Sequence, residues 1–117
     1  MQRELTARTK AFAVRIVRLY DALPHTTVGY VIGKQVLRSG TSPGAHAREA
    51  YRSRSTAEVI SKLEVALQEL DETAYWLELL IEAEIVRPKR LQPLLTEIDE
   101  LIAIIVTSVK TMKRRGK

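Results

Sequence analysis

STAEVISKLEVALQELDETAYWLELLI, the stretch from residue 55 to residue 81, carries the clearest helical signal in the chain. Ser55 and Glu58 stand at its start as a capping box, in which each side chain satisfies a backbone amide of the first turn. Apolar residues then recur at spacings of three and four, which is a heptad seam. The pattern predicts a helix over residues 56–84. The core positions expected along it are Ile60, Leu63, Leu67, Leu70, Leu77 and Ile81.

Three further helices are expected beside this one. Apolar stripes at helical spacing predict helices over residues 4–23, 28–52 and 88–113. The turn between the second helix and the third is too short for anything but an antiparallel reversal. Strand signals are poor, because runs that alternate between polar and apolar residues are absent. We therefore expect an all-α protein that forms one domain over residues 1–117.

The composition narrows the class of protein. A chain of 117 residues is long enough for one domain with a core. It contains no cysteine, which excludes a disulfide framework and a thiolate metal site. The longest apolar run, residues 101–106, is far shorter than the roughly 20 residues that span a bilayer. The first ten residues lack the apolar segment of a signal peptide. We expect a soluble, cytoplasmic protein.

Charge is segregated along the chain. Residues 1–55 hold ten Lys/Arg and three Asp/Glu, residues 56–86 hold one lysine and eight acids, and residues 87–117 hold eight cations and three acids. This order favours packing of unlike neighbours. The formal net charge of +5 also leaves a surplus of cations on the surface.

The second helix carries a line of very small residues and a proline. Another helix can lie closely on the small residues, which are Gly33, Gly40, Gly44 and Ala47. Pro43 follows Thr41 and Ser42, which can act as N-caps. We therefore expect the helix to kink near Ser42-Pro43 or to restart there briefly.

A basic face runs along the same helix. Lys34, Arg38, Arg48 and Arg52 fall on one side of a helical repeat, and Arg15 and Arg18 of the first helix are possible extensions of it. These six residues are the candidate nucleic-acid-binding residues. Two other interpretations stay open. The face can be an ordinary solvated charge run, or Arg48 and Arg52 can form ion pairs with Glu69 and Glu72.

The fourth helix has a wider apolar arc than one seam of a small bundle buries. A second stripe on it indicates a contact with another copy of the chain, and the candidate interface residues are Leu95, Ile102 and Val106. Pro93 lies near the start of this helix and predicts an irregular first turn or a restart there.

Little in the sequence points to catalysis. His25 and His46 have no acid at metal-ligand spacing, and there is no phosphate-cradling glycine loop or nucleophile elbow. Acidic side chains of the third helix could line a groove, but a solvated face, or pairing with Arg15 and Arg18, explains them better. These acids are Glu69, Asp71, Glu72 and Glu78. We expect no catalytic residue, no cofactor and no metal site, and hence no enzyme.

Three segments together resemble a known family. They are FAVRIVRLYDALP at residues 12–24, LRSGTSPGAHAREAYRSRS at residues 37–55 and ELDETAYWLELL at residues 69–80. They are similar to the bacterial four-helix-bundle family of 23S rRNA intervening-sequence proteins, over nearly the whole chain. The resemblance implies an antiparallel up-down four-helix bundle.

The same resemblance implies more about assembly than about activity. Members of this family, and the similar accessory protein of diversity-generating retroelements, form homopentamers. For the retroelement relatives it implies a basic surface that engages nucleic acid and a reverse transcriptase. Members encoded inside rRNA intervening sequences have no established activity. This chain has Pro43-Gly44-Ala45-His46 where an asparagine often follows the small residues, so the role of that asparagine does not carry over.

The first interpretation of the sequence is therefore a non-enzymatic, oligomeric protein whose basic face binds RNA or DNA phosphates without reading base sequence. The alternative is a structural or protein-interaction module whose segregated charges serve only self-assembly or docking of a partner protein. An enzyme that works through the acids between Glu69 and Glu78 is the third option.

Overall fold

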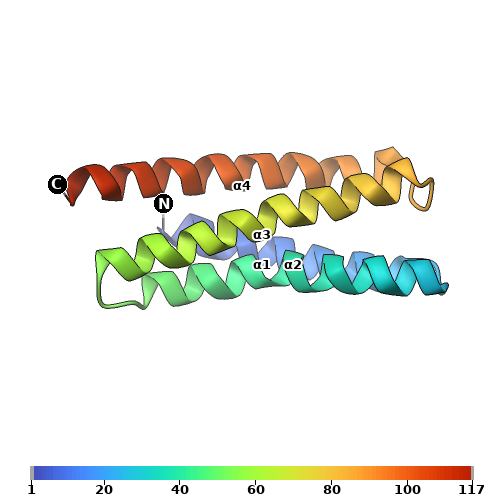
Figure 1. The fold of residues 1–117 in the computed structure, drawn as a ribbon, viewed down its shortest axis with the longest axis horizontal. Helices are drawn as coiled ribbons and strands as arrows, with labels where there is room; N and C mark the ends of the chain where they lie inside the picture. The colour runs from blue at the N-terminus through green and yellow to red at the C-terminus, as the bar shows by residue number, and fades with distance from the viewer. Residues whose placement is uncertain (1, 117) are drawn as a thin grey trace.

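The computed structural model of the protein describes residues 2–116. It contains four helices, and no strand occurs in this part of the chain. Their bounds are α1 Gln2–Ala22, α2 Thr27–Tyr51, α3 Thr56–Glu82 and α4 Pro88–Arg115. Successive helices run in opposite directions along an elongated body of 50 × 20 × 19 Å (Figure 1). The predicted all-α, antiparallel four-helix bundle is confirmed.

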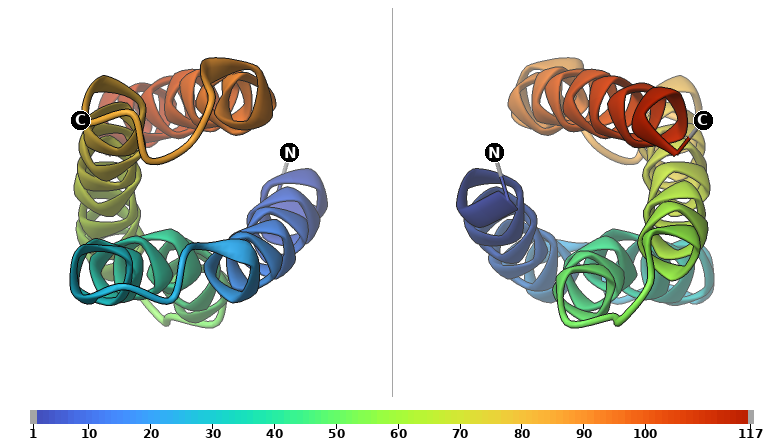
Figure 2. Two further views of the ribbon diagram at one scale, coloured as in Figure 1. Left: turned by 90° about the vertical axis from the view of Figure 1, so that its right-hand side faces the viewer. Right: turned by 90° about the vertical axis from the view of Figure 1, so that its left-hand side faces the viewer.

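The helices lie in chain order around an arc when the bundle is seen end-on (Figure 2). Each helix packs against the next one, whereas α1 and α4, at the two ends of the arc, pack least closely. No helix among the described residues combines the length and the apolar character needed to cross a membrane.

Residues suited to N-terminal positions stand at the starts of three helices. The Thr26 hydroxyl accepts a hydrogen bond from the Gly29 amide at 3.0 Å, and the Ser55 hydroxyl accepts one from the Glu58 amide at 3.2 Å. Both are N-cap bonds that satisfy an otherwise unpaired donor of the first turn. α4 begins instead at Pro88, whose missing amide hydrogen costs nothing at that position.

Neither internal proline interrupts its helix. α2 runs unbroken through Pro43, and α4 runs unbroken through Pro93, so neither helix restarts at its proline. The alternative expected for α2, a kink near Ser42-Pro43, stays a prediction. The hydroxyls of Thr41 and Ser42 do not cap a new helix. They donate backward to the carbonyls of Leu37 and Arg38 at 2.7 and 2.8 Å, a bonding mode that bends helices without ending them.

The core seam of α3 is displaced from the predicted one. Leu63, Leu70 and Leu77 are fully buried as expected, but Ile60, Leu67 and Ile81 are only partly buried at the edge of the core. The positions fully buried in their place are Ala66, Thr73 and Leu80. The reason is the close approach of α2, which turns the deepest face of α3 toward small and hydroxyl side chains. Thr73 donates to the buried Ser39 hydroxyl of α2 at 2.9 Å.

The small residues of α2 bring α1 close, as the sequence predicts. A Cβ atom added at Gly40 would lie 2.8 Å from a side-chain carbon of Ile16, which is too close for a carbon contact. A Cβ atom at Gly44 would lie 3.3 Å from the carbonyl oxygen of Thr9. The backbones of α1 and α2 are therefore near enough for residues on their outer edges to share one surface.

Candidate nucleic-acid interface

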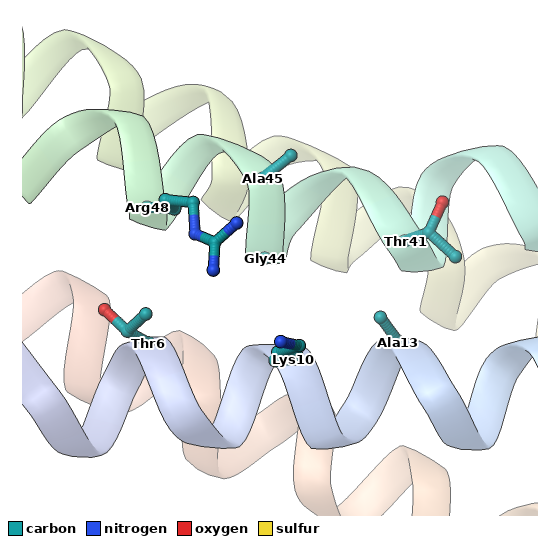
Figure 3. A pocket seen from close by; sticks show the side chains of 7 residues that line it. All are labelled: Thr6, Lys10, Ala13, Thr41, Gly44, Ala45 and Arg48. Carbon is teal, nitrogen blue, oxygen red and sulfur yellow. The ribbon is translucent and has the colours of Figure 1, made fainter.

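A pocket of about 160 Å³ lies between α1 and α2 on the outer side of this close contact. Its lining residues are Thr6, Lys10 and Ala13 of α1 and Thr41, Gly44, Ala45 and Arg48 of α2. In Figure 3 the guanidinium of Arg48 extends from α2 across the gap toward α1, between Thr6 and Lys10. The methyl groups of the alanines and the absence of a side chain at Gly44 keep the pocket open. Two cations from two helices thus meet at one small cavity.

The pocket offers charge rather than hydroxyl donors. The Thr6 hydroxyl donates to the Gln2 carbonyl at 3.0 Å, and the Thr41 hydroxyl donates to the Leu37 carbonyl, so both hydrogens are already used. Within residues 2–116 neither Lys10 nor Arg48 has a carboxylate within salt-bridge distance. An anion in this pocket would therefore be held by the ammonium and the guanidinium groups.

Two more of the predicted residues extend this cationic surface along α2. Lys34 and Arg52 are exposed, and no acid of the described chain pairs with either side chain. Lys34 falls on the helical face that carries Arg48, and Arg52 is the C-cap residue that follows α2. We refer to Lys10, Lys34, Arg48 and Arg52 as the α1–α2 basic face.

Arg38 has a different environment from the other predicted cations. Its guanidinium pairs with Glu72 of α3, and it also donates to Gln35 at 3.0 Å. Glu72 accepts a further hydrogen bond from the indole Nε1 of Trp76 at 3.0 Å. The Trp76 hydrogen bond lowers the pKa of Glu72 most, burial opposes it, and Arg38 lowers the pKa further. Arg38 thus belongs to the contact between α2 and α3.

The ion pairs expected for Arg48 and Arg52 do not form. Glu69 instead faces His46, whose Nδ1 lies 2.9 Å from its Oε1 and 3.0 Å from the Ser42 carbonyl oxygen. One ring hydrogen can serve only one of these acceptors, and Glu69 Oε1 is buried without a well-aligned hydrogen bond. The acids nearest the basic helix are therefore engaged by His46 and Arg38. This leaves Arg48 and Arg52 without acidic partners.

Arg15 and Arg18 lie on the other side of α1, away from the α1–α2 basic face. They line a pocket of about 290 Å³ together with Leu19 of the same helix and Arg90, Pro93 and Leu94 of α4. The six predicted residues are therefore not brought together. Three lie on α2 and one of those is paired, Arg52 is the C-cap of α2, and the two on α1 line a pocket with a cation of α4.

Sequence reasoning missed Lys10 and Arg90. Neither lies in the segment that carries the basic face, and each contributes only because a second helix places it opposite other cations. Lys10 could have been found by aligning α1 against the small residues of α2. Arg90 needed the antiparallel register of α1 and α4.

Comparison with known proteins identifies the family of this chain and a solved structure that is similar to it. Residues 2–107 match the family described as 23S rRNA-intervening sequence protein. The chain belongs to this family. A crystal structure of a protein of unknown function from the S23 ribosomal protein family of Bacteroides thetaiotaomicron VPI-5482 superposes with a TM-score of 0.88 and 39% sequence identity. The match covers 93% of this chain and 97% of that chain. None of the curated proteins compared with it matches the chain.

In this 23S rRNA-intervening sequence protein, the stripe predicted as an oligomer interface is partly covered within the chain itself. Leu95, Ile102 and Val106 are each half-buried, and the first two pack against the core. The large apolar side chains with the most exposure lie on α1, α2 and α3. They are Val14, Val17, Val28, Tyr30, Val31, Val65 and Tyr75.

Proposed function

We propose that this family member is a non-enzymatic nucleic-acid-binding protein that acts as a homo-oligomer and contacts phosphates through the α1–α2 basic face. The observation that carries the proposal is the pocket where Lys10 and Arg48 converge without an acidic partner in the described chain. Cations gathered on one surface create a positive potential that attracts anions.

The arrangement of the basic face suits a phosphate backbone. Lys34 lies on α2 and Arg52 is its C-cap, 18 positions later, which is roughly 27 Å at 1.5 Å per residue. Arg48 lies near one end of that line, and Lys10 broadens it toward α1. Contacts of this kind position a strand without reading its bases. We therefore expect binding that is largely independent of nucleotide sequence.

Neutralising the pocket should weaken nucleic-acid binding. We expect the double variant Lys10→Gln, Arg48→Gln to bind a fluorescent oligonucleotide up to roughly 100-fold more weakly at 50 mM salt, with a salt slope smaller by about two. Fluorescence anisotropy titrations at several salt concentrations measure both quantities. Lys110→Gln is the matched control, because Lys110 is exposed on α4, outside the basic face. Equal losses in the control and the double variant would contradict the assignment.

We also propose that the protein assembles, as a pentamer by the resemblance of its sequence to the family. The exposed valines of α1 and α2, together with Tyr30, support a contact between copies. Sedimentation velocity at tens of micromolar protein should show an oligomer instead of a 13.2 kDa species. The oligomer should persist at high salt, because apolar contacts are not screened. A monomer under these conditions would rule the proposal out.

The second candidate function is a protein-interaction module. The ion pair of Arg38 with Glu72 favours it, because this cation of the predicted basic face serves the fold and not a ligand. An assay of RNA and DNA binding at low salt distinguishes the two candidate functions. An interaction module forms the oligomer but leaves RNA and DNA unbound even at low salt.

A further inference from the structure

The contact between α1 and α4 changes character along its length. At one end Arg8 of α1 pairs with two acids of α4, Glu97 at 2.6 Å and Glu100 at 2.9 Å. These hydrogen bonds raise the pKa of the Arg8 guanidinium. Because the helices are antiparallel, residues later in α1 lie opposite earlier residues of α4.

About two turns later in α1, the α4 residue beside it is a cation instead of an acid. Arg15 and Arg18 of α1 share the 290 Å³ pocket with Arg90 of α4. None of the three arginines has a carboxylate partner in residues 2–116. Like charges placed together repel, and the buried Leu19 and Leu94 line the same pocket. A bound anion would relieve this repulsion.

We propose that the pocket of Arg15, Arg18 and Arg90 binds a phosphate monoester. A monoester carries close to two negative charges at neutral pH, since its second pKa is about 6. Each guanidinium offers a planar fork of donors that suits phosphate oxygens. Three forks around one cavity match the larger charge and the free oxygens of a monoester.

A phosphodiester suits this pocket less well than it suits the α1–α2 basic face. Each phosphodiester carries one negative charge, and the next phosphate along the strand needs its own cation some distance away. The α1–α2 basic face supplies that spacing, whereas the three arginines line one pocket. The monoester can be the 5′ end of a strand or a free mononucleotide. The strand-end form rests on the proposed function, and the mononucleotide form does not.

The test compares two forms of one short oligonucleotide that differ only at the 5′ end. We expect the 5′-phosphorylated form to bind wild-type protein roughly tenfold more tightly than the 5′-hydroxyl form in anisotropy titrations, a difference of 1.4 kcal/mol. Arg90→Gln should remove this preference and leave the affinity for the 5′-hydroxyl form nearly unchanged. Lys89→Gln is the matched control, since Lys89 neighbours Arg90 but lies outside the pocket. Arg18→Gln should act like Arg90→Gln, and circular dichroism melting checks that each variant folds.

A second arm identifies the source of the phosphate. Adenosine 5′-monophosphate, titrated by calorimetry, should bind wild-type protein and fail to bind Arg90→Gln, whereas adenosine should bind neither. If the monophosphate binds but oligonucleotides do not, the site takes a free monoester and the proposed function fails alone. If both oligonucleotides bind equally and the monophosphate does not bind, the pocket proposal is overturned while the proposed function stands. It is equally overturned if Arg90→Gln dissociates the oligomer without altering phosphate binding, because the arginines then hold a carboxylate of another copy.

Discussion

Replacing Leu70 with alanine should lower the free energy of unfolding by about 2–5 kcal/mol. Leu70 lies in the middle of α3, and its side chain is completely buried in the main core cluster. Truncation removes the apolar contacts of the deleted carbons and leaves a cavity that the surrounding helices fill only in part. Chemical denaturation followed by circular dichroism measures the loss, and we expect no change in helix content before the transition.

Leu67→Ala is the matched control for this substitution. Leu67 lies one turn from Leu70 on the same helix, and it is only partly buried at the edge of the core. The same chemical change should therefore cost clearly less free energy of unfolding. If Leu67→Ala proves as damaging as Leu70→Ala, the core seam of α3 follows the heptad predicted from the sequence and not the one in the structure.

Local signals in the sequence were sufficient for the architecture. In the stretch of residues 55–81, Ser55 marks the start of a helix and an uninterrupted apolar repeat marks its length. The short connections between helices imply that the chain reverses direction at each one. The face that α3 buries most deeply could not be predicted in the same way. Thr73 and Ala66 look less suited to a core than Leu67 does, and they are buried because α2 approaches closely and supplies Ser39 as a hydrogen-bond partner.

The tendency of proline to break a helix did not decide where these helices end. Pro43 is incompatible with an ideal helix interior, yet α2 continues through it within a packed bundle. Tertiary contacts on both sides of α2 hold this segment helical, and they are invisible in a single stretch of sequence.

The candidate site was predictable only where it lies on one helix. The shared face of Lys34, Arg48 and Arg52 follows from helical spacing alone. Which cations are free does not follow, because it depends on the acids of neighbouring helices. Arg38 is engaged by Glu72, whereas Arg48 meets Lys10 of α1. Such pairings require the register of one helix against another.

Salt dependence distinguishes a phosphate-binding surface from a charged face that serves assembly. Each phosphate neutralised by a cation releases condensed counterions, so affinity falls steeply as salt rises. The α1–α2 basic face provides four cations in one copy, and an oligomer repeats them. In the proposed oligomer, this repetition would allow six or more simultaneous phosphate contacts without any new chemistry.

The most direct measurement is therefore the affinity of wild-type protein for an RNA or DNA duplex at 50 and 200 mM salt, with sedimentation velocity run in the same buffers. We predict an affinity loss of about 10³-fold or more between the two salt concentrations, with the oligomer intact in both. Absence of binding at 50 mM salt by an intact oligomer would contradict the account and leave the basic face with a structural role.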